Sequence, residues 1–380
     1  MRKTALTATI LGIAGALVAA AGLRETKPAA STLPVADAGA RVQIALLLDT
    51  SNSMDGLIDQ ARSQLWHVVN DFAVAKKAGR APAVELALYE YGKATVPAAD
   101  GYVRRVVPFT ADLDRVSEAL FSLTTNGGEE YCGRAIAEAT RGLEWSPDAG
   151  DLKLIFIAGN EPFDQGALDW HDAIRAARAR GITVNVVHAG AEEERGWRDA
   201  AAFAGGEYVK IDQDRRIVAV AAPQDAEIER LGVELNATYL PYGAGGSEAA
   251  ERQQAQDANA VAVRQGAPVQ RALSKASAAY DNRGWDLVDA AKSGLAVEKL
   301  ADADLPPALR GLGAAERSAK IAAAAARRQE LQSRIQTLDA ARRAFVAQAA
   351  KAQSARPDTL DAAVTRALRG QAEKMGFRFE

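Results

Sequence analysis

The stretch from residue 42 to residue 53 reads VQIALLLDTSNS, and the rest of the chain is arranged around it. Its first seven residues are an apolar run, too short to span a membrane and of the right length for a fully buried strand. A helical pattern follows from about Met54 to Lys76, so the polar residues 49–53 fall at a turn between strand and helix. In an open α/β sheet, ligands collect at that end of a strand.

This turn carries oxygen-bearing side chains at alternate positions: Asp49, Ser51 and Ser53. Converging carboxylate and hydroxyl oxygens suit a hard divalent cation such as Mg²⁺, which takes few protein ligands and retains water. The alternative is structural, because Asp and Ser are also the usual N-cap residues, which satisfy the free amides of a helix start. The turn by itself leaves both interpretations open.

Strand and helix patterns alternate from residue 41 to about residue 213. This order predicts a doubly wound, mostly parallel sheet with helices on both faces. From about Ala222 the short apolar strands stop, and an alanine-rich sequence with interleaved charges predicts an α-helical C-terminal region. After the first strand and helix, the alternating region is expected to contain strands at 84–91, 102–109, 151–158, 182–188 and 207–211. Its further helices are expected at 112–123, 132–143, 167–180 and 192–203.

The Asp-x-Ser-x-Ser turn and the strand–helix order together resemble the von Willebrand factor type A domain and its metal-ion-dependent adhesion site. In that family the cation is held by this motif, by a threonine of a second loop and usually by an aspartate of a third. A protein partner donates a carboxylate to the open coordination position. The resemblance implies a Rossmann-like domain over residues 41–222, followed by a linker over 223–247 and a helical region over 248–380.

The second loop reads TTNGGEE from residue 124. The family usually has its threonine after the glycines, where this chain has Glu129. The resemblance therefore implies either Thr125 or Glu129 as the ligand from this loop. A plain Gly-Gly turn, with Glu129 and Glu130 at the positive end of the next helix, is the structural alternative.

The third loop reads AGNEP from residue 158, with Gly159 where the family has aspartate. Asn160 or Glu161 is expected to take over, because an amide oxygen is also a legitimate ligand for a hard cation. The loss of one carboxylate predicts a weaker site, or one that depends more on an acidic partner.

The first residues predict a secretory signal peptide over residues 1–23. Arg2 and Lys3 precede a long apolar segment that ends in small residues, and residues 24–40 have the composition of a flexible leader. An uncleaved membrane anchor is the alternative, because the apolar run is long for a signal peptide. We therefore expect an exported protein, periplasmic or extracellular, that meets a membrane only through such an anchor.

Charge and residue types exclude several classes of function. The formal net charge is −3, and it becomes −5 without the two positive charges of Arg2 and Lys3; a mildly acidic chain argues against a nucleic-acid partner. Cys132, the only cysteine, cannot form an intramolecular disulfide and is expected to be a small apolar helix residue. The three histidines lack metal-ligand spacing, and neither a phosphate loop nor a nucleophile elbow is present.

The sequence therefore predicts an exported, non-enzymatic binding protein in which Mg²⁺, Mn²⁺ or Ca²⁺ links the domain to a protein carboxylate. The alternative is an envelope scaffold that binds through its helical region and has a vestigial metal site. In that region a heptad-like stripe from Leu331 to Phe345 predicts either a helix-hairpin packing face or a coiled coil for a partner. Removal of all residues after Ala222 would separate the two readings. A hydrolase with an unrecognised site is a third hypothesis.

Overall fold

The computed structural model describes residues 39–190, 196–213, 220–263, 266–352 and 360–379. The expected signal peptide and most of the leader lie outside these residues. Within the described ranges, every helix is too short or too polar to cross a bilayer.

Six strands of the described chain form one central sheet in the order β4-β3-β1-β5-β6-β7. All run parallel except β4, which is antiparallel to β3. The mostly parallel sheet that the alternating pattern predicts is therefore confirmed. The strands are β1 Arg41–Asp49, β3 Ala83–Tyr91, β4 Val103–Thr110, β5 Leu152–Gly159, β6 Thr183–His188 and β7 Tyr208–Lys210.

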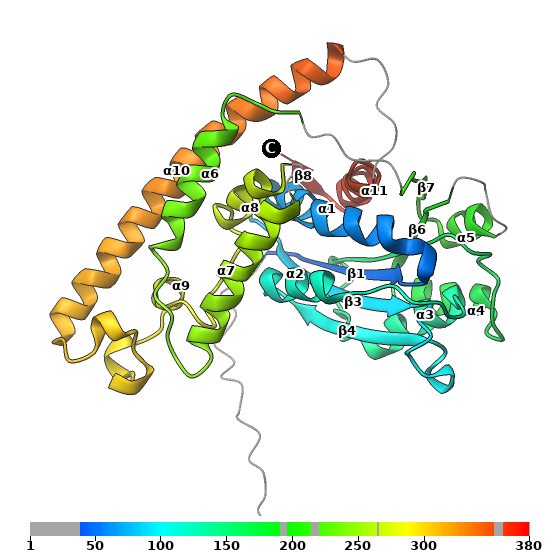
Figure 1. Cartoon of the computed structure of the whole chain (residues 1–380), viewed down its shortest axis with the longest axis horizontal. Helices are drawn as coiled ribbons and strands as arrows, with labels where there is room; N and C mark the ends of the chain where they lie inside the picture. Colours follow the sequence, from blue (N-terminus) through cyan, green and yellow to red (C-terminus); the bar gives the residue numbers. More distant parts are fainter. Residues whose placement is uncertain (1–38, 191–195, 214–219, 264–265, 353–359, 380) are drawn as a thin grey trace, which may run out of the picture. The chain divides into compact units, whose positions relative to one another are not determined.

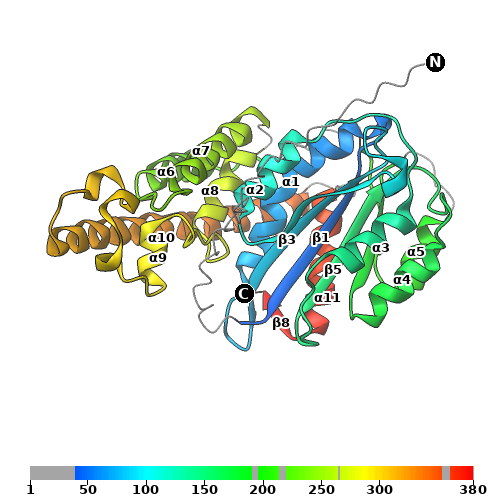
Figure 2. The same cartoon turned by 90° about the horizontal axis from the view of Figure 1, so that it is seen from below.

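Helices cover both faces of this sheet (Figures 1 and 2). Strands buried on both faces need apolar residues at nearly every position, which is why β1 and β5 are continuous apolar runs. One face is covered by α1 (Asp55–Ala73), α2 (Leu113–Ser122) and α11 (Leu360–Lys374), and the other by α3 (Cys132–Gly142), α4 (Trp170–Ala179) and α5 (Trp197–Ala204).

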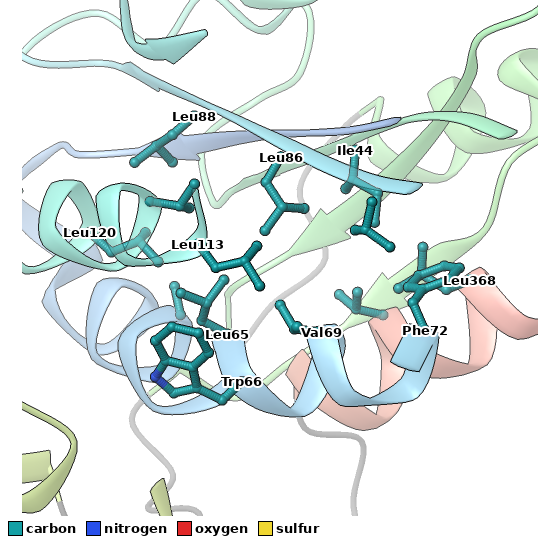
Figure 3. Close-up of a cluster of buried hydrophobic side chains, with 14 of the residues drawn as sticks. Ile44, Leu65, Trp66, Val69, Phe72, Leu86, Leu88, Leu113, Leu120 and Leu368 are labelled. Carbon is teal, nitrogen blue, oxygen red and sulfur yellow. The ribbon is translucent and has the colours of Figure 1, made fainter. Parts of the chain in front are cut away.

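Helix α1 shows how the sequence pattern produces this packing. Leu65, Val69 and Phe72 recur at steps of three and four residues, so they share one face of the helix. All three are buried against the sheet, and Figure 3 shows them directed toward the strand residues Ile44 and Leu86. Truncating one such side chain to alanine typically costs about 2–5 kcal/mol of stability.

The last helix, α11, returns to the sheet and does not belong with the rest of the helical region. Its Leu368 is fully buried beside Phe72 of α1 (Figure 3). Gln371 and Asn185 of β6 exchange two buried side-chain hydrogen bonds, of 2.6 and 3.1 Å. The sheet unit therefore includes residues from both ends of the described chain.

A short second sheet also links the C-terminal end of the described chain to the segment after α1. Strand β8 (Phe377–Phe379) pairs antiparallel with β2 (Ala75–Lys77), which directly follows α1. Removal of everything after Ala222 would therefore take away α11 and β8 and expose the core under them. That truncation cannot separate a binding role of the sheet domain from one of the helical region.

Residues 223–247 contain helix α6 (Asp225–Asn236), where the sequence suggested a linker. Ile228, Leu231 and Leu235 of α6 are fully buried in the main core. Their spacing of three and four residues is the pattern of an amphipathic helix. The segment is part of the packed structure.

The helical region consists of α7 (Gly246–Val263), α8 (Ala267–Lys275), α9 (Leu287–Lys292) and the long α10 (Ala314–Ala352). Helix α10 runs alongside α6 (Figure 1), and its Arg327, Arg334 and Arg342 form ion pairs with acidic residues of α6. Leu331 and Ile335 of the heptad-like stripe are fully buried. That part of the stripe is an intramolecular packing face, whereas Phe345 further along is 39% exposed.

Four charged side chains, three of them buried and here together named the Arg271 cluster, connect the helical region to the sheet unit. Arg271 of α8 lies 2.5 Å from Asp114 of α2 and 2.8 Å from Asp257 of α7, and Lys275 lies 2.7 Å from Asp257. The guanidinium group of Arg271 also lies 4.4 Å from the ring centroid of Trp66 in α1. The cluster thus joins helices of both parts of the chain through paired charges.

Candidate metal site

The last residues of four strands meet at the carboxyl edge of the sheet. Asp49 at the end of β1 is in register with Tyr91 of β3, and Gly159 of β5 is in register with His188 of β6. Strand β1 lies between β3 and β5, so the chain leaves it first toward one side of the sheet and later toward the other. Such a switch point is where open α/β sheets bind ligands.

Asp49 is fully buried at this edge. Its Oδ1 accepts a hydrogen bond of 2.8 Å from the amide of Ser51, whereas its Oδ2 has no hydrogen-bond partner among the described residues. Burial, together with the nearby charge of Glu130, raises the pKa of Asp49 to about 7. A carboxylate so poorly solvated favours either a proton or a cation beside it.

The two serines of the turn do not act as helix caps. Ser51 precedes a 3₁₀ turn (Asn52–Met54) without a side-chain capping bond, and its buried hydroxyl lacks a hydrogen-bond partner within the described chain. The hydroxyl of Ser53 instead accepts a hydrogen bond of 3.0 Å from Nδ2 of Asn160 in the third loop. The capping interpretation therefore does not explain why Ser51 is present.

Asn160 brings the third loop to the turn. Its Nδ2 is used by Ser53, so its Oδ1 remains as a buried acceptor without a partner in the described structure. Asn160 Oδ1, Asp49 Oδ2 and Ser51 Oγ are thus three unpaired buried oxygens from two adjacent loops. The structure brings Asn160 to the predicted site, while Glu161 beside it is exposed.

The second loop places its predicted ligands elsewhere. The hydroxyl of Thr125 donates to the carboxylate of Asp55 at 2.5 Å, and Glu129 is exposed. Thr124 accepts a hydrogen bond of 2.8 Å from Nζ of Lys93. No contact of the described residues brings an oxygen of Thr125 or Glu129 to Asp49.

The residue of this loop that does enter the site is Glu130, which is buried. A Cβ added to Gly92 would lie 2.7 Å from Oδ1 of Asp49 and 2.9 Å from Cγ of Glu130, so both acidic side chains border the same point. Burial raises the pKa of Glu130, and the charge of Glu161 raises it further. Alternate side chains of an extended loop point to opposite sides, and this was the signal that could have distinguished Glu130 from Glu129.

Glycines let the second loop approach so closely. A Cβ on Gly128 would lie 2.5 Å from the carbonyl oxygen of Gly92, and one on Gly127 would lie 3.2 Å from Nδ2 of Asn52. The backbone amide of Asn126 donates to the carbonyl of Thr50 at 2.9 Å. Gly128 is therefore required by the contact of the second loop with the backbone after β3, whereas a Cβ at Gly127 would only press on the Asn52 side chain.

Tyr91 explains why the third loop carries Gly159. A Cβ on Gly159 would lie 2.4 Å from the hydroxyl oxygen of Tyr91 and 3.1 Å from Oδ2 of Asp49. The Tyr91 hydroxyl is fully buried and donates a hydrogen bond of 2.9 Å to the carbonyl of Ala158. A side chain at position 159 would point at Asp49, but Tyr91 occupies the space that it needs.

These residues form an all-oxygen donor set: the carboxylates of Asp49 and Glu130, the hydroxyls of Ser51 and Ser53, and the amide oxygen of Asn160. Over the described residues, no three His, Cys, Asp or Glu side chains are grouped so as to hold a metal. The set therefore relies on hydroxyl and amide oxygens beside its two carboxylates. That chemistry fits Mg²⁺, Mn²⁺ or Ca²⁺ and does not suit a soft metal.

The remaining reactive residues lie apart from this set or are inert. Burial raises the pKa of the Cys132 thiol well above its usual range, so it stays protonated at neutral pH. His171 pairs with Asp169 at 2.7 Å on the surface, and His188 is buried at the end of β6 with its ring 5.3 Å from that of Trp197.

Comparison with known proteins gives one family and a set of similar structures. The von Willebrand factor type A domain family matches residues 43–217. No curated protein matches the chain in sequence.

Three of the similar solved structures illustrate the range. A von Willebrand factor type A protein from Catenulispora acidiphila has 19% identity, a TM-score of 0.34, and coverage of 46% of this chain and 39% of its own. The SpRpn10 VWA domain has 15% identity, a TM-score of 0.34, and coverage of 47% and 90%. Proximal thread matrix protein 1 of the mussel byssus, with a zinc-occupied MIDAS motif, has 11% identity, a TM-score of 0.36, and coverage of 47% and 43%. The chain thus spans about two fifths of the first and third of these proteins.

The family match covers the segment whose strand order and strand-end loops are described above. Residues 43–217 of this chain are a von Willebrand factor type A domain.

Proposed function

We propose that this domain binds a divalent cation, Mg²⁺ first, and through it a protein partner that donates a carboxylate. The observation that carries the proposal is the group of unpaired buried oxygens of Asp49, Ser51 and Asn160. A buried polar atom without a partner costs about 1–3 kcal/mol, so several at one strand-end edge are best explained by a bound group. A hard cation would satisfy all of them at once.

Titration of the full chain with Mg²⁺, Mn²⁺ and Ca²⁺ by calorimetry tests the metal half of the proposal. We expect saturable binding of at least one cation and its loss in Asp49→Asn, which keeps the shape of the side chain and removes its charge. Asp59→Asn is the matched control, because Asp59 is an exposed carboxylate on α1. Identical titrations of the wild type and Asp49→Asn would contradict the proposal.

The partner half is tested by capture of binding proteins with and without a chelator. We expect capture to require the cation and to fail with Asp49→Asn even when the cation is present. A partner that is retained equally well in chelator binds elsewhere on the molecule.

We further propose that the protein is a binding module and not an enzyme. The buried Cys132 thiol, which burial keeps protonated, supports this view. A hydrolase screen of the purified chain with ester, peptide and phosphoester substrates tests it. Turnover that disappears with one point mutation would refute it.

The basic and apolar segment at residues 1–23 supports the proposal that the protein is exported. N-terminal sequencing of the protein from a host that secretes it tests this. A mature protein that starts after residue 22 or 23 is expected, and recovery of the full chain from the membrane would point to an uncleaved anchor instead.

The envelope-scaffold hypothesis remains as a second candidate, on one observation. Helix α10 continues past its last ion pair with α6, at Arg342, and there Phe345 is 39% exposed. A scaffold that binds through this end would lose its partner in Phe345→Ser and keep it in Asp49→Asn. The cation-dependent module would show the reverse, so the two variants replace the truncation after Ala222.

A further inference from the structure

The acidic residues at the metal site differ in position from the arrangement that the resemblance implies. The third loop has no carboxylate, because Gly159 stands at its head. The second loop has one instead, and it is buried beside Asp49. The number of carboxylates at the site is thus the same as in the expected pattern, with one of them on a different loop.

Sterics couple these two changes. A side chain at position 159 would run into the Tyr91 hydroxyl at 2.4 Å, so Tyr91 and any third-loop aspartate exclude each other. Tyr91 cannot replace the lost charge itself, because burial keeps its pKa well above the usual range and its hydroxyl already donates to Ala158. The site can therefore gain a second negative charge only from another direction.

Glu130 supplies that direction. It reaches the Asp49 carboxylate past Gly92, whose missing Cβ leaves the room, since that atom would touch both acidic side chains. Gly92 also has a φ of 78°, which disfavours any other residue there. Gly128 then holds the loop against the carbonyl of Gly92, so the glycines keep Glu130 in place.

We propose, on the basis of the cation-binding function above, that Glu130 is a direct cation ligand that replaces the third-loop aspartate. Tyr91 and Gly159 belong to the same replacement, because the Tyr91 hydroxyl occupies the space that a third-loop side chain would need. Two carboxylates in the shell neutralise the charge of a divalent cation. The domain therefore binds its cation before any partner arrives, and the partner adds the last ligand to a metal that is already held.

The test is a cation titration of the full chain in the absence of any partner, by calorimetry and by the shift in melting temperature with Mg²⁺, Mn²⁺ or Ca²⁺. We expect Glu130→Gln, which keeps the size of the side chain, to weaken cation binding by at least about 10-fold, as loss of a group that supports a metal typically does. Glu129→Gln removes the same charge one residue earlier, on an exposed side chain, and is expected to leave the affinity nearly unchanged.

The exchange itself is tested by rebuilding the third-loop carboxylate. Gly159→Asp alone should destabilise the protein, whereas Tyr91→Phe with Gly159→Asp removes the obstructing hydroxyl. In the background of Glu130→Gln, this pair should restore cation affinity. If the triple variant does not fold, the comparison of Glu130→Gln with Glu129→Gln still decides the role of Glu130.

The outcomes separate this inference from the function on which it depends. A wild-type chain that binds no cation overturns the proposed function and this inference together. If Glu130→Gln binds the cation as tightly as the wild type does, only this inference is overturned. The ligands would then be Asp49, Ser51 and Asn160.

Discussion

The metal site and the Arg271 cluster each contain two carboxylates, but only the cluster pairs its carboxylates with positive charges of the chain. In the Arg271 cluster, Asp114 and Asp257 each lie within an ion-pair distance of a cationic side chain. At the metal site, Asp49 and Glu130 have no such partner among the residues that the structure describes, and burial raises the pKa of each.

The pKa directions express the same contrast. Burial alone would raise the pKa of Asp257, but Lys275 and Arg271 lower it below the usual value. For Lys275, burial outweighs the attraction of Asp257 and lowers the pKa to about 8. A carboxylate whose counter-charge comes from the chain is structural, whereas one without a counter-charge is poised to receive it from outside.

The largest expected effect comes from breaking the paired cluster. Arg271→Ala removes the guanidinium group that pairs with both Asp114 and Asp257. Because a buried carboxylate is then left without its counter-charge, the free energy of unfolding should fall by about 3–5 kcal/mol. Denaturant unfolding of the full chain measures it. Arg230→Ala removes a guanidinium from exposed ion pairs on α6 and should have a far smaller effect. Equal losses would mean that burial of the cluster contributes nothing.

The unpaired site should respond in the opposite direction. In chelator, Asp49→Asn removes a buried charge and should stabilise the protein above pH 7, by up to roughly 4 kcal/mol for three pKa units at about 1.4 kcal/mol each. A raised carboxyl pKa means that the folded state binds the proton more tightly. The cost of Asp49 is therefore complete above its folded pKa of about 7 and shrinks as the pH falls toward its unfolded value. Unfolding curves at several pH values measure the gain, and a gain that grows toward acid pH would contradict the assignment.

Removal of an uncharged buried hydrogen-bonded pair should have an intermediate effect on the free energy of unfolding. Gln371→Ala removes both hydrogen bonds to Asn185 and leaves that amide partly unsatisfied, for an expected loss of about 1–3 kcal/mol. A double-mutant cycle with Asn185→Ala measures the coupling between them. Additive losses would show that α11 is held to β6 by apolar packing alone.

The smallest effect is expected at the half-exposed edge of the metal site. Thr125→Val removes the hydroxyl that donates to Asp55 and should change cation affinity by about 2-fold or less, since surface substitutions typically act within 0.5 kcal/mol. The same calorimetric titration measures it. A loss of tenfold or more would place Thr125 in the metal shell and move the second-loop ligand away from Glu130.

Periodicity predicted most of the fold because it records burial directly. Each strand and helix expected between residues 41 and 211 has a counterpart in the described structure, and α7 to α10 fall in the region expected to be helical. The exceptions are β2 and β8, which have three residues each, and α6, which lies before the glycine-rich residues 243–246 that suggested a linker. The return of α11 to the sheet could not be read from its pattern, because an amphipathic helix does not specify which apolar surface it covers.

The sequence by itself determined the turn at residues 49–53, the strand before it and the sheet on which it lies, because these depend on local spacing and on strand-by-strand burial. It also showed that the third loop lacks its aspartate. Only the tertiary structure decided that Tyr91 fills that space and that Glu130, not Glu129, lies beside Asp49. These facts depend on contacts between loops some 40 to 110 residues apart, and the approach of such loops is set by the packing of the whole sheet.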